Sequence, residues 1–259
     1  MQWHIGIFDA FLFPPMTAHM IPFHLYGVYH IAALAFCAVL MYGLFYWMRR
    51  IETPTDVARI EKVFLWALIL LNVETTIAEV WNGIWSLAEG LPFHLCDISA
   101  WTLIYAMFSR NERAFQAGYF WGMAGGLAGL ALPEVYYIDV YYAPFFFWHF
   151  LLVAMPLYLV RIVGFRPTHR GLWETLGITA VISAPIGLAV WLIPNANYMF
   201  LKRPPQAFAG LAFMVWPWYL LFLFGLGAVI FYLLWLPFAP QTKRIWEANP
   251  VRIRLRNRI

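Results

Sequence analysis

The sequence predicts an all-α membrane protein: a polytopic bundle of seven transmembrane helices with its N-terminus outside and its C-terminus in the cytoplasm. Of the 259 residues, 63% are hydrophobic and 12% are charged, which is about half the charged fraction of a soluble domain. Apolar stretches recur along the chain, and most of them have the roughly 20 residues that a bilayer crossing needs. The basic residues are concentrated in alternate connections between these stretches.

We place the seven spans at roughly residues 23–48, 62–84, 92–109, 115–132, 144–163, 172–193 and 209–236. The third is short and is expected to begin deeper in the membrane. Because little of the chain lies outside the spans, we expect a single transmembrane domain over residues 1–259. Residues 1–21, interrupted by Pro14 and Pro15, fit an interfacial segment. Residues 237–259 fit a basic cytoplasmic tail attracted to anionic lipids.

The distribution of Lys and Arg sets the orientation. The connections after spans one, three and five, together with the tail, hold 15 of the 17 basic residues, and only Lys202 and Arg203 lie on the other side. Cytoplasmic connections carry such an excess in membrane proteins. The distribution therefore favours an odd number of spans and an outside N-terminus. It also explains the net charge of +4 without nucleic acid as a partner.

Span four carries Gly118, Gly122 and Gly126 at intervals of four residues, with Gly125 and Gly129 beside them. This spacing lets two helix backbones approach closely. We interpret it as tight packing inside one bundle. A helix-packed dimer is the alternative to a monomer.

Polar and ionisable residues gather on the outer side in this orientation. Glu74 lies in the outward-running half of span two, and Cys96 and Asp97 lie just inside the outer end of span three. Six of the seven histidines fall on the same side, with His169 as the exception. Ionisable groups within spans are costly and usually face a bundle interior or a wet cavity. The outer half therefore holds the candidate site.

Cys96 and His149 are the candidate catalytic residues. Each lies about 6–7 Å beyond a proline that can start its helix, at 1.5 Å per residue, so the two side chains share one depth. A thiol and an imidazole at one depth are the minimum for acyl transfer: the imidazole removes the thiol proton, and the thiolate attacks a carbonyl to form a thioester. Cys37, in AFCAVL, has only apolar neighbours and is expected to be structural.

Supporting roles stay open for His94, Asp97, Glu74, Asn195, Asn197 and Tyr198. A carboxylate could orient an imidazole, and an asparagine amide could donate to a developing oxyanion. His94 cannot easily share the face of Cys96, because two residues turn a helix by about 200°, but it could face Asp97. A metal site is the other chemistry open to these residue types, with His24, His94 and His149 as ligands. No close H-x-x-x-H or C-x-x-C pair marks one, so neither a metal nor another cofactor is expected.

Three motifs carry a resemblance to a known family: HLCDIS at 94–99, FFFWHF around His149, and NANYMFLKRPP at 195–205. From span one to span seven, the chain resembles the YwaF-like bacterial integral membrane proteins and their animal relative, the transmembrane protein 164 acyltransferase family. The resemblance to the animal member implies transfer of a fatty acyl chain from a phospholipid donor onto a lyso ether phospholipid, and the resemblance to the bacterial members implies an integral protein of a bacterial inner membrane. It also implies that Cys96 is the acyl-accepting nucleophile and His149 its base.

These features predict a membrane-embedded lipid acyltransferase, or an acyl hydrolase, that acts on phospholipid and lysophospholipid at the outer leaflet through a Cys96 thioester. A small-molecule or ion transporter, or a receptor, with a polar outward-facing cavity is the first alternative, because buried Glu74 and Glu79 would also suit ion coupling. A metal-dependent membrane enzyme is the second.

Overall fold

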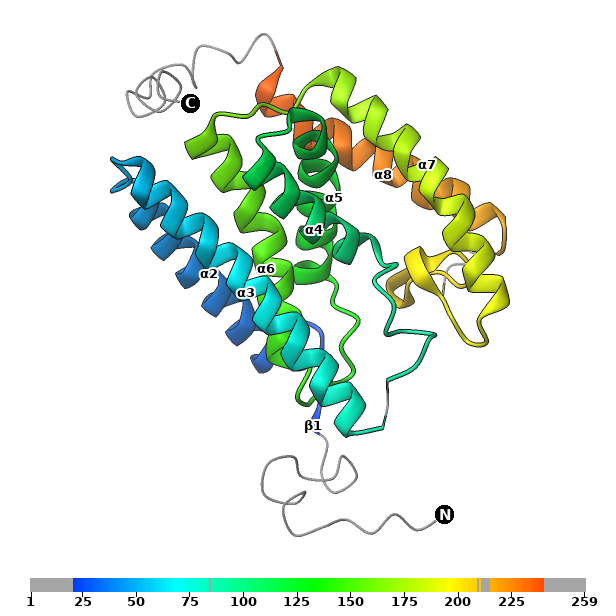
Figure 1. Ribbon diagram of the computed structural model, residues 1–259. Coiled ribbons are helices and arrows are strands. Elements are labelled where there is room, and N and C mark those ends of the chain that lie inside the picture. The colour runs from blue at the N-terminus through cyan, green and yellow to red at the C-terminus, as the bar shows by residue number, and fades with distance from the viewer. Residues whose placement is uncertain (1–20, 84, 209, 211–214, 240–259) are drawn as a thin grey trace.

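The computed structural model describes residues 21–83, 85–208, 210 and 215–239. In this part of the chain, seven long helices are joined by shorter connections (Figure 1). They are α2 (Val28–Met48), α3 (Pro54–Trp81), α4 (Leu95–Ser109), α5 (Glu112–Ala131), α6 (Tyr142–Tyr158), α7 (His169–Leu192) and α8 (Trp218–Trp235). A π-helical turn, Leu159–Val163, continues α6. The predicted all-α class is confirmed.

Five helices among the described residues are long and apolar enough to cross a membrane: α2, α3, α6 with its π-helical turn, α7, and α8 with the 3-10 turn Leu236–Phe238. The chain is therefore an integral membrane protein. α4 has 15 residues, about 22 Å at 1.5 Å per residue, so the third predicted span is indeed short. Residues 1–20 and 240–259, with His4, His19 and most of the predicted interfacial segment and basic tail, lie outside the described residues.

The largest differences from the predicted helix starts are at α3 and α8. α3 begins at Pro54 rather than near residue 62, because Thr53 and Asp56 form a capping box: the Asp56 N–H donates to Thr53 Oγ1 (3.2 Å), and the Thr53 N–H donates to Asp56 Oδ2 (3.1 Å). α8 begins at Trp218 rather than near residue 209. It follows Pro217, which has no N–H to give to a preceding helical turn.

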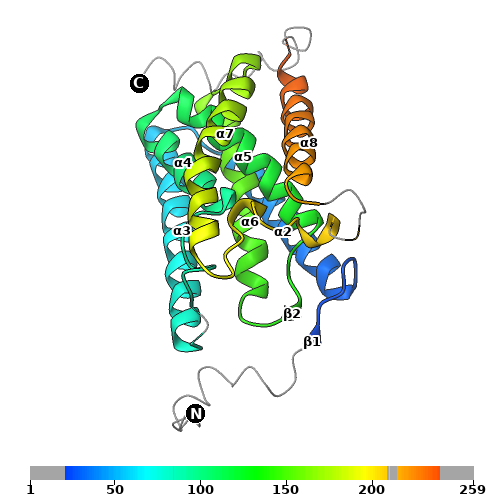
Figure 2. The same cartoon turned by 90° about the vertical axis from the view of Figure 1, so that its right-hand side faces the viewer.

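α5 and α6 form the centre of the bundle (Figures 1 and 2). α5 contacts α4, α6, α7 and α8, and α6 also contacts α2, α3 and α4. Glycines of α5 permit the closest of these contacts. A Cβ on Gly118 would lie 2.8 Å from the Leu103 side chain of α4, and one on Gly126 would lie 2.8 Å from Val153 of α6. Packing inside the bundle therefore explains the four-residue spacing of the glycines.

The bundle has two chemically different ends. The basic end carries the α2–α3, α4–α5 and α6–α7 connections, with Arg49, Arg50, Arg110, Arg113, Arg166 and Arg170 on or beside them. The opposite end, here named the site end, carries the connections 82–94, 132–141 and 193–217. There β1 (Ile21–Pro22) pairs antiparallel with β2 (Tyr137–Ile138), and the 3-10 turns η2 (Tyr198–Phe200) and η3 (Gln206–Phe208) follow α7.

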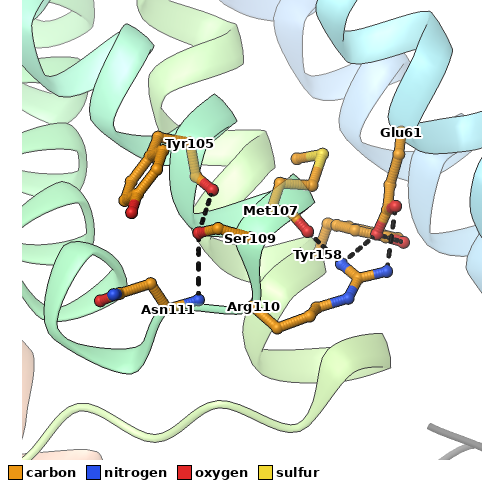
Figure 3. Close-up of polar contacts among 7 residues, drawn as sticks. All are labelled: Glu61, Tyr105, Met107, Ser109, Arg110, Asn111 and Tyr158. Carbon is orange, nitrogen blue, oxygen red and sulfur yellow. Dashed lines mark hydrogen bonds and ion pairs between the residues drawn. The ribbon is translucent and has the colours of Figure 1, made fainter.

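At the basic end, an ion pair with a buried carboxylate links neighbouring helices (Figure 3). Arg110, which ends α4 in the left-handed conformation, donates two hydrogen bonds to the carboxylate of Glu61 in α3, at 2.6 and 3.0 Å. Tyr158 of α6 donates its hydroxyl to the same carboxylate at 2.9 Å, and Arg110 also donates to the carbonyl of Met107. Glu61 is only 4% exposed. One buried carboxylate therefore joins three helices.

Candidate active site

Cys96 lies in the first turn of α4, at the site end. The helix begins after His94, whose carbonyl accepts hydrogen bonds from the N–H groups of Asp97 (3.1 Å) and Ile98 (3.2 Å). No side chain caps this helix end. The first N–H groups of a helix carry partial positive charge, which favours negative charge on the sulfur, whereas the burial of the thiol and the neighbouring Asp97 carboxylate oppose that charge.

The hydrogen-bond partner of the Cys96 thiol is the carboxylate of the next residue. Cys96 Sγ donates to Asp97 Oδ1 at 3.9 Å, and no hydrogen bond joins the thiol to His149 or His94 in the described part of the chain. The Glu79 carboxylate of α3 acts electrostatically on Asp97. Neither carboxylate forms an ion pair with a described Lys or Arg. The carboxylate that accepts from the thiol therefore has no cationic partner among the described residues.

His149 is buried in α6 and is held in one orientation. Its Nδ1 lies 2.8 Å from the carbonyl oxygen of Phe145, so Nδ1 carries the proton and Nε2 keeps its lone pair. The Phe145 ring packs on the imidazole with 4.2 Å between ring centroids. Against the ring lies Gly129 of α5, where a Cβ would be 2.5 Å from Nε2. This tautomer is the one that a general base acting through Nε2 needs.

His94 immediately precedes α4 and lies close enough to His149 for the two imidazoles to interact electrostatically. Its ring packs edge-on against Tyr198 at 5.1 Å and Phe200 at 6.4 Å between centroids. Among the described residues, the His94 imidazole makes no hydrogen bond to the Asp97 carboxylate, the partner that the helix spacing suggested. The structure thus brings His94 to His149 and to the η2 turn.

Tyr198 anchors the connection that leads into α4. Its side chain is fully buried, and its hydroxyl donates to the carbonyl of Leu87 (2.8 Å) and accepts from the N–H of Leu91 (3.0 Å). Burial raises the pKa of Tyr198, so the hydroxyl remains a neutral donor at neutral pH. The tyrosine of the NANY motif therefore fixes the backbone just before the Cys96 segment.

Asn197 closes the loop that presents Tyr198. Its Oδ1 accepts from the N–H groups of Lys202 (3.1 Å) and Arg203 (2.8 Å), and its Nδ2 donates to the carbonyl of Arg203 (3.1 Å). Asn195 is left-handed, with φ of 65°, and its carbonyl accepts from the Arg203 guanidinium at 3.0 Å. The Asn197 amide is thus committed to this turn, and the oxyanion role considered from the sequence would require it to leave the turn.

Tyr141 belongs to the site end although no sequence motif marks it. Its hydroxyl is buried and has no hydrogen-bond partner among the described residues. Burial, helped by the carboxylates of Glu79, Asp139 and Glu74, raises the pKa of Tyr141 to about 12. Glu74, expected from the sequence to be buried, is instead exposed on α3, whereas Glu79 is half-buried. The position of Tyr141 directly before α6 is the only signal that the sequence offers.

Two further side chains with reactive groups, His30 and Cys37, are buried in α2. His30 is fully buried: its Nδ1 accepts from the N–H of Tyr26 (3.0 Å), and its Nε2 donates to the carbonyl of Leu130 (2.8 Å). Cys37 is 6% exposed, and its thiol donates to the carbonyl of Phe146 at 3.8 Å. Its burial agrees with the structural role expected from its apolar neighbours. Both cysteines are free thiols.

Within the described residues, no group of three or more His, Cys, Asp or Glu side chains is placed to hold a metal ion. His24, one of the three ligands considered from the sequence, is exposed in the turn before α2. His94 and His149 interact with each other, but no third ligand of these types joins them in this part of the chain.

A cavity of about 650 Å³ lies between α4, α5 and α7. Ile98 and Thr102 form its α4 wall. Cys96 is two residues from Ile98, about 200° around the helix, so the thiol and the cavity lie on different faces of α4. The cavity is therefore separate from the face of α4 that carries Cys96.

The family model described as the TMEM164 family matches residues 25–235. This range contains α2 to α8 and every candidate site residue named above except His24. No curated protein and no solved structure matches the chain.

Proposed function

The chain belongs to the TMEM164 family, and on that premise we propose that it is a membrane-embedded lipid acyltransferase that works through a thioester on Cys96. The observation that carries the proposal is the arrangement at the site end. A free thiol lies at an uncapped helix N-terminus, and the buried imidazole of His149 presents an unprotonated Nε2. A nucleophile and a base with a lone pair are what acyl transfer through a covalent intermediate requires.

In the first half-reaction, Cys96 Sγ attacks the ester carbonyl carbon of a phospholipid while its proton passes to His149 Nε2. The ester C–O bond breaks, the acyl group remains on sulfur as a thioester, and His149 returns the proton to the departing lysophospholipid oxygen. In the second, the hydroxyl of another lysophospholipid gives its proton to His149 and attacks the thioester carbonyl carbon. The C–S bond breaks, the acyl group leaves as the new ester, and the proton passes from His149 to sulfur. Water in place of that lysophospholipid makes the same cycle an acyl hydrolase.

The resting geometry adds one requirement. Because the thiol donates to Asp97, the Cys96 side chain must turn from Asp97 toward His149 when substrate binds. Catalytic hydrogen bonds commonly form only in the substrate complex. Asp97 is therefore the competing proton acceptor, and the two bases can be distinguished by mutation.

The proposal includes an orientation. Placing the basic end in the cytoplasm follows the positive-inside rule. With α4 and α5 as additional crossings, the chain has seven spans, an outside N-terminus and its site at the outer leaflet. We propose a bacterial inner membrane as its location, with phospholipid and lysophospholipid as its partners.

Intact-protein mass spectrometry tests the thioester. The full-length protein, in nanodiscs that contain phospholipid, is quenched with acid. We expect the wild type to carry an acyl adduct that hydroxylamine removes. Cys96→Ala should carry none, and Cys37→Ala, which removes the other thiol, should keep it. An adduct that persists in Cys96→Ala, or its absence from the wild type, refutes the proposal.

The rate of acylation identifies the base. Removing a general base slows a reaction by about 10²–10⁴-fold, so His149→Gln should slow acylation by that factor and Asp97→Asn by much less. The reverse order would assign the base to Asp97. Adding a labelled lysophospholipid to the acylated protein then separates transfer, which labels a diacyl product, from hydrolysis, which releases a fatty acid.

A further inference from the structure

The cavity between α4, α5 and α7, here named the groove, plays no part in the proposed acyl transfer. α4 and α7 both pack on α5, and Figure 1 shows α7 leaning away from α4 toward the site end. The polar groups of its surroundings are mostly paired: Thr102 Oγ1 donates to the carbonyl of Ile98 (2.6 Å), and Trp121 Nε1 donates to Thr179 Oγ1 (2.8 Å). The wall that remains is apolar.

The length of this groove suits an extended hydrocarbon chain. Along α7 its lining runs from Ile178 to Ala189, about 16 Å at 1.5 Å per residue. That is roughly half of a hydrocarbon core of about 30 Å, or the depth of one leaflet. Arg113 lines the groove at the basic end, and Pro92 and Phe93 line it toward the site end.

Arg113 is the only charged side chain among the described residues that line the groove. It is exposed in the first turn of α5, and no described carboxylate pairs with it. At the same end, by contrast, Arg110 pairs with Glu61 and Arg170 pairs with Glu174. A guanidinium binds phosphate oxygens through two parallel hydrogen bonds. The groove thus combines an apolar wall with one guanidinium that can donate hydrogen bonds to a phosphate.

We propose that this groove binds one acyl chain of a phospholipid from the leaflet at the basic end, with the lipid phosphodiester on Arg113. The apolar walls of α4, α5 and α7 contact the acyl chain, and the guanidinium binds the head group. This lipid is distinct from the acyl-transfer substrate, because the groove and Cys96 lie on different faces of α4. It fills the space between α4 and α7.

Photocrosslinking of the full-length protein tests the site. The protein in a maltoside detergent, which carries no phosphate, receives a subsaturating amount of phosphatidylglycerol with a diazirine in one acyl chain, and adducts are located by peptide mass spectrometry. We expect the adducts to concentrate on the groove lining. A charged hydrogen bond contributes about tenfold in binding, so Arg113→Gln should lower labelling of the lining about tenfold. Arg49→Gln removes an exposed cation of the same end that does not line the groove, and it should change nothing.

A second pair of variants tests the position of the acyl chain. Ala189→Trp places a large ring in the half-buried lining of the groove and should abolish labelling there, whereas Ala184→Trp, on the exposed surface of α7, should leave it intact. Even labelling of all helices in the wild type overturns the site. Unchanged labelling in Arg113→Gln overturns the head-group contact, and unchanged labelling in Ala189→Trp overturns the chain position. Cys96→Ala should label like the wild type, which separates this result from the fate of the acyl-transfer proposal.

Discussion

The two ends of the bundle differ in whether their carboxylates have a cationic partner. At the basic end, Glu61 is buried and paired, since it accepts hydrogen bonds from Arg110 and Tyr158. At the site end, Asp97 and Glu79 act on each other and have no cationic partner among the described residues. Buried charge stabilises a fold only when it is paired. The basic end is therefore built for stability, and the site end keeps unpaired charge where the proposed chemistry lies.

Breaking the ion pair of the basic end should cause the largest loss of stability. Arg110→Met leaves the Glu61 carboxylate buried without a cation, which typically costs about 3–5 kcal/mol. The measurement is the free energy of unfolding in mixed micelles with increasing SDS. The matched control is Arg170→Met, because both partners of the Arg170–Glu174 pair are exposed and such pairs contribute at most about 0.5 kcal/mol. Equal losses in the two variants would contradict the role given to the buried pair.

Gly129→Ala should displace the imidazole of His149 at the site end. Its Cβ would lie 2.5 Å from Nε2, so the imidazole must move. We expect a loss of about 1–3 kcal/mol from overpacking and, because a displacement of about 1 Å costs about 100-fold, acylation slower by that factor. Gly125→Ala is the control on the same helix, since nothing lies within 4 Å of its Cβ. Equally slow acylation in Gly125→Ala would exclude the imidazole contact as the cause.

Removing the hydroxyl of Tyr198 should loosen the connection before Cys96. Tyr198→Phe leaves the carbonyl of Leu87 and the N–H of Leu91 without their partner, at a cost of about 1–3 kcal/mol. Hydrogen exchange of residues 85–94 should become faster. Tyr105→Phe removes a hydroxyl from a side chain that is 58% exposed, and it should leave this exchange unchanged. Unaltered exchange in Tyr198→Phe would show that other contacts hold the connection.

Removing the charge of Asp97 should have the smallest effect on stability. Asp97→Asn breaks no ion pair among the described residues and relieves repulsion from Glu79. We expect the free energy of unfolding to change by less than about 1 kcal/mol, measured as for Arg110→Met. A loss as large as that of Arg110→Met would mean that the carboxylates of the two ends do not differ in their structural role.

The helices were largely predictable because long apolar stretches are a strong signal in a membrane protein. The start of α3 was missed because its first turns carry the charges of Asp56, Arg59 and Glu61, which a search for apolar residues rejects. The capping signal of Thr53, Pro54 and Asp56 was nevertheless present in the sequence. Capping residues therefore locate the end of a membrane helix where hydropathy does not.

The site was predictable in its members but not in their partners. Cys96, Asp97 and His149 carry polar or reactive groups inside apolar stretches, and this contrast is visible in a sequence. The support of His149 by Gly129 and the bond of Tyr198 to Leu91, 107 residues away, depend on how the helices pack. Joint action of Cys96 and His149 in acyl transfer stays a prediction that the mass measurement tests.

The shortness of α4 has a consequence for the bilayer itself. Its 15 residues span about 22 Å, roughly 8 Å less than the hydrocarbon core. Lipids around a short helix respond to such a hydrophobic mismatch by local thinning. If Ser109 is level with one boundary of the core, we expect a dimple in the opposite leaflet above Cys96. The ester groups of the surrounding lipids would then descend to the level of the sulfur, so that the protein bends the membrane toward its nucleophile instead of extracting a lipid from it.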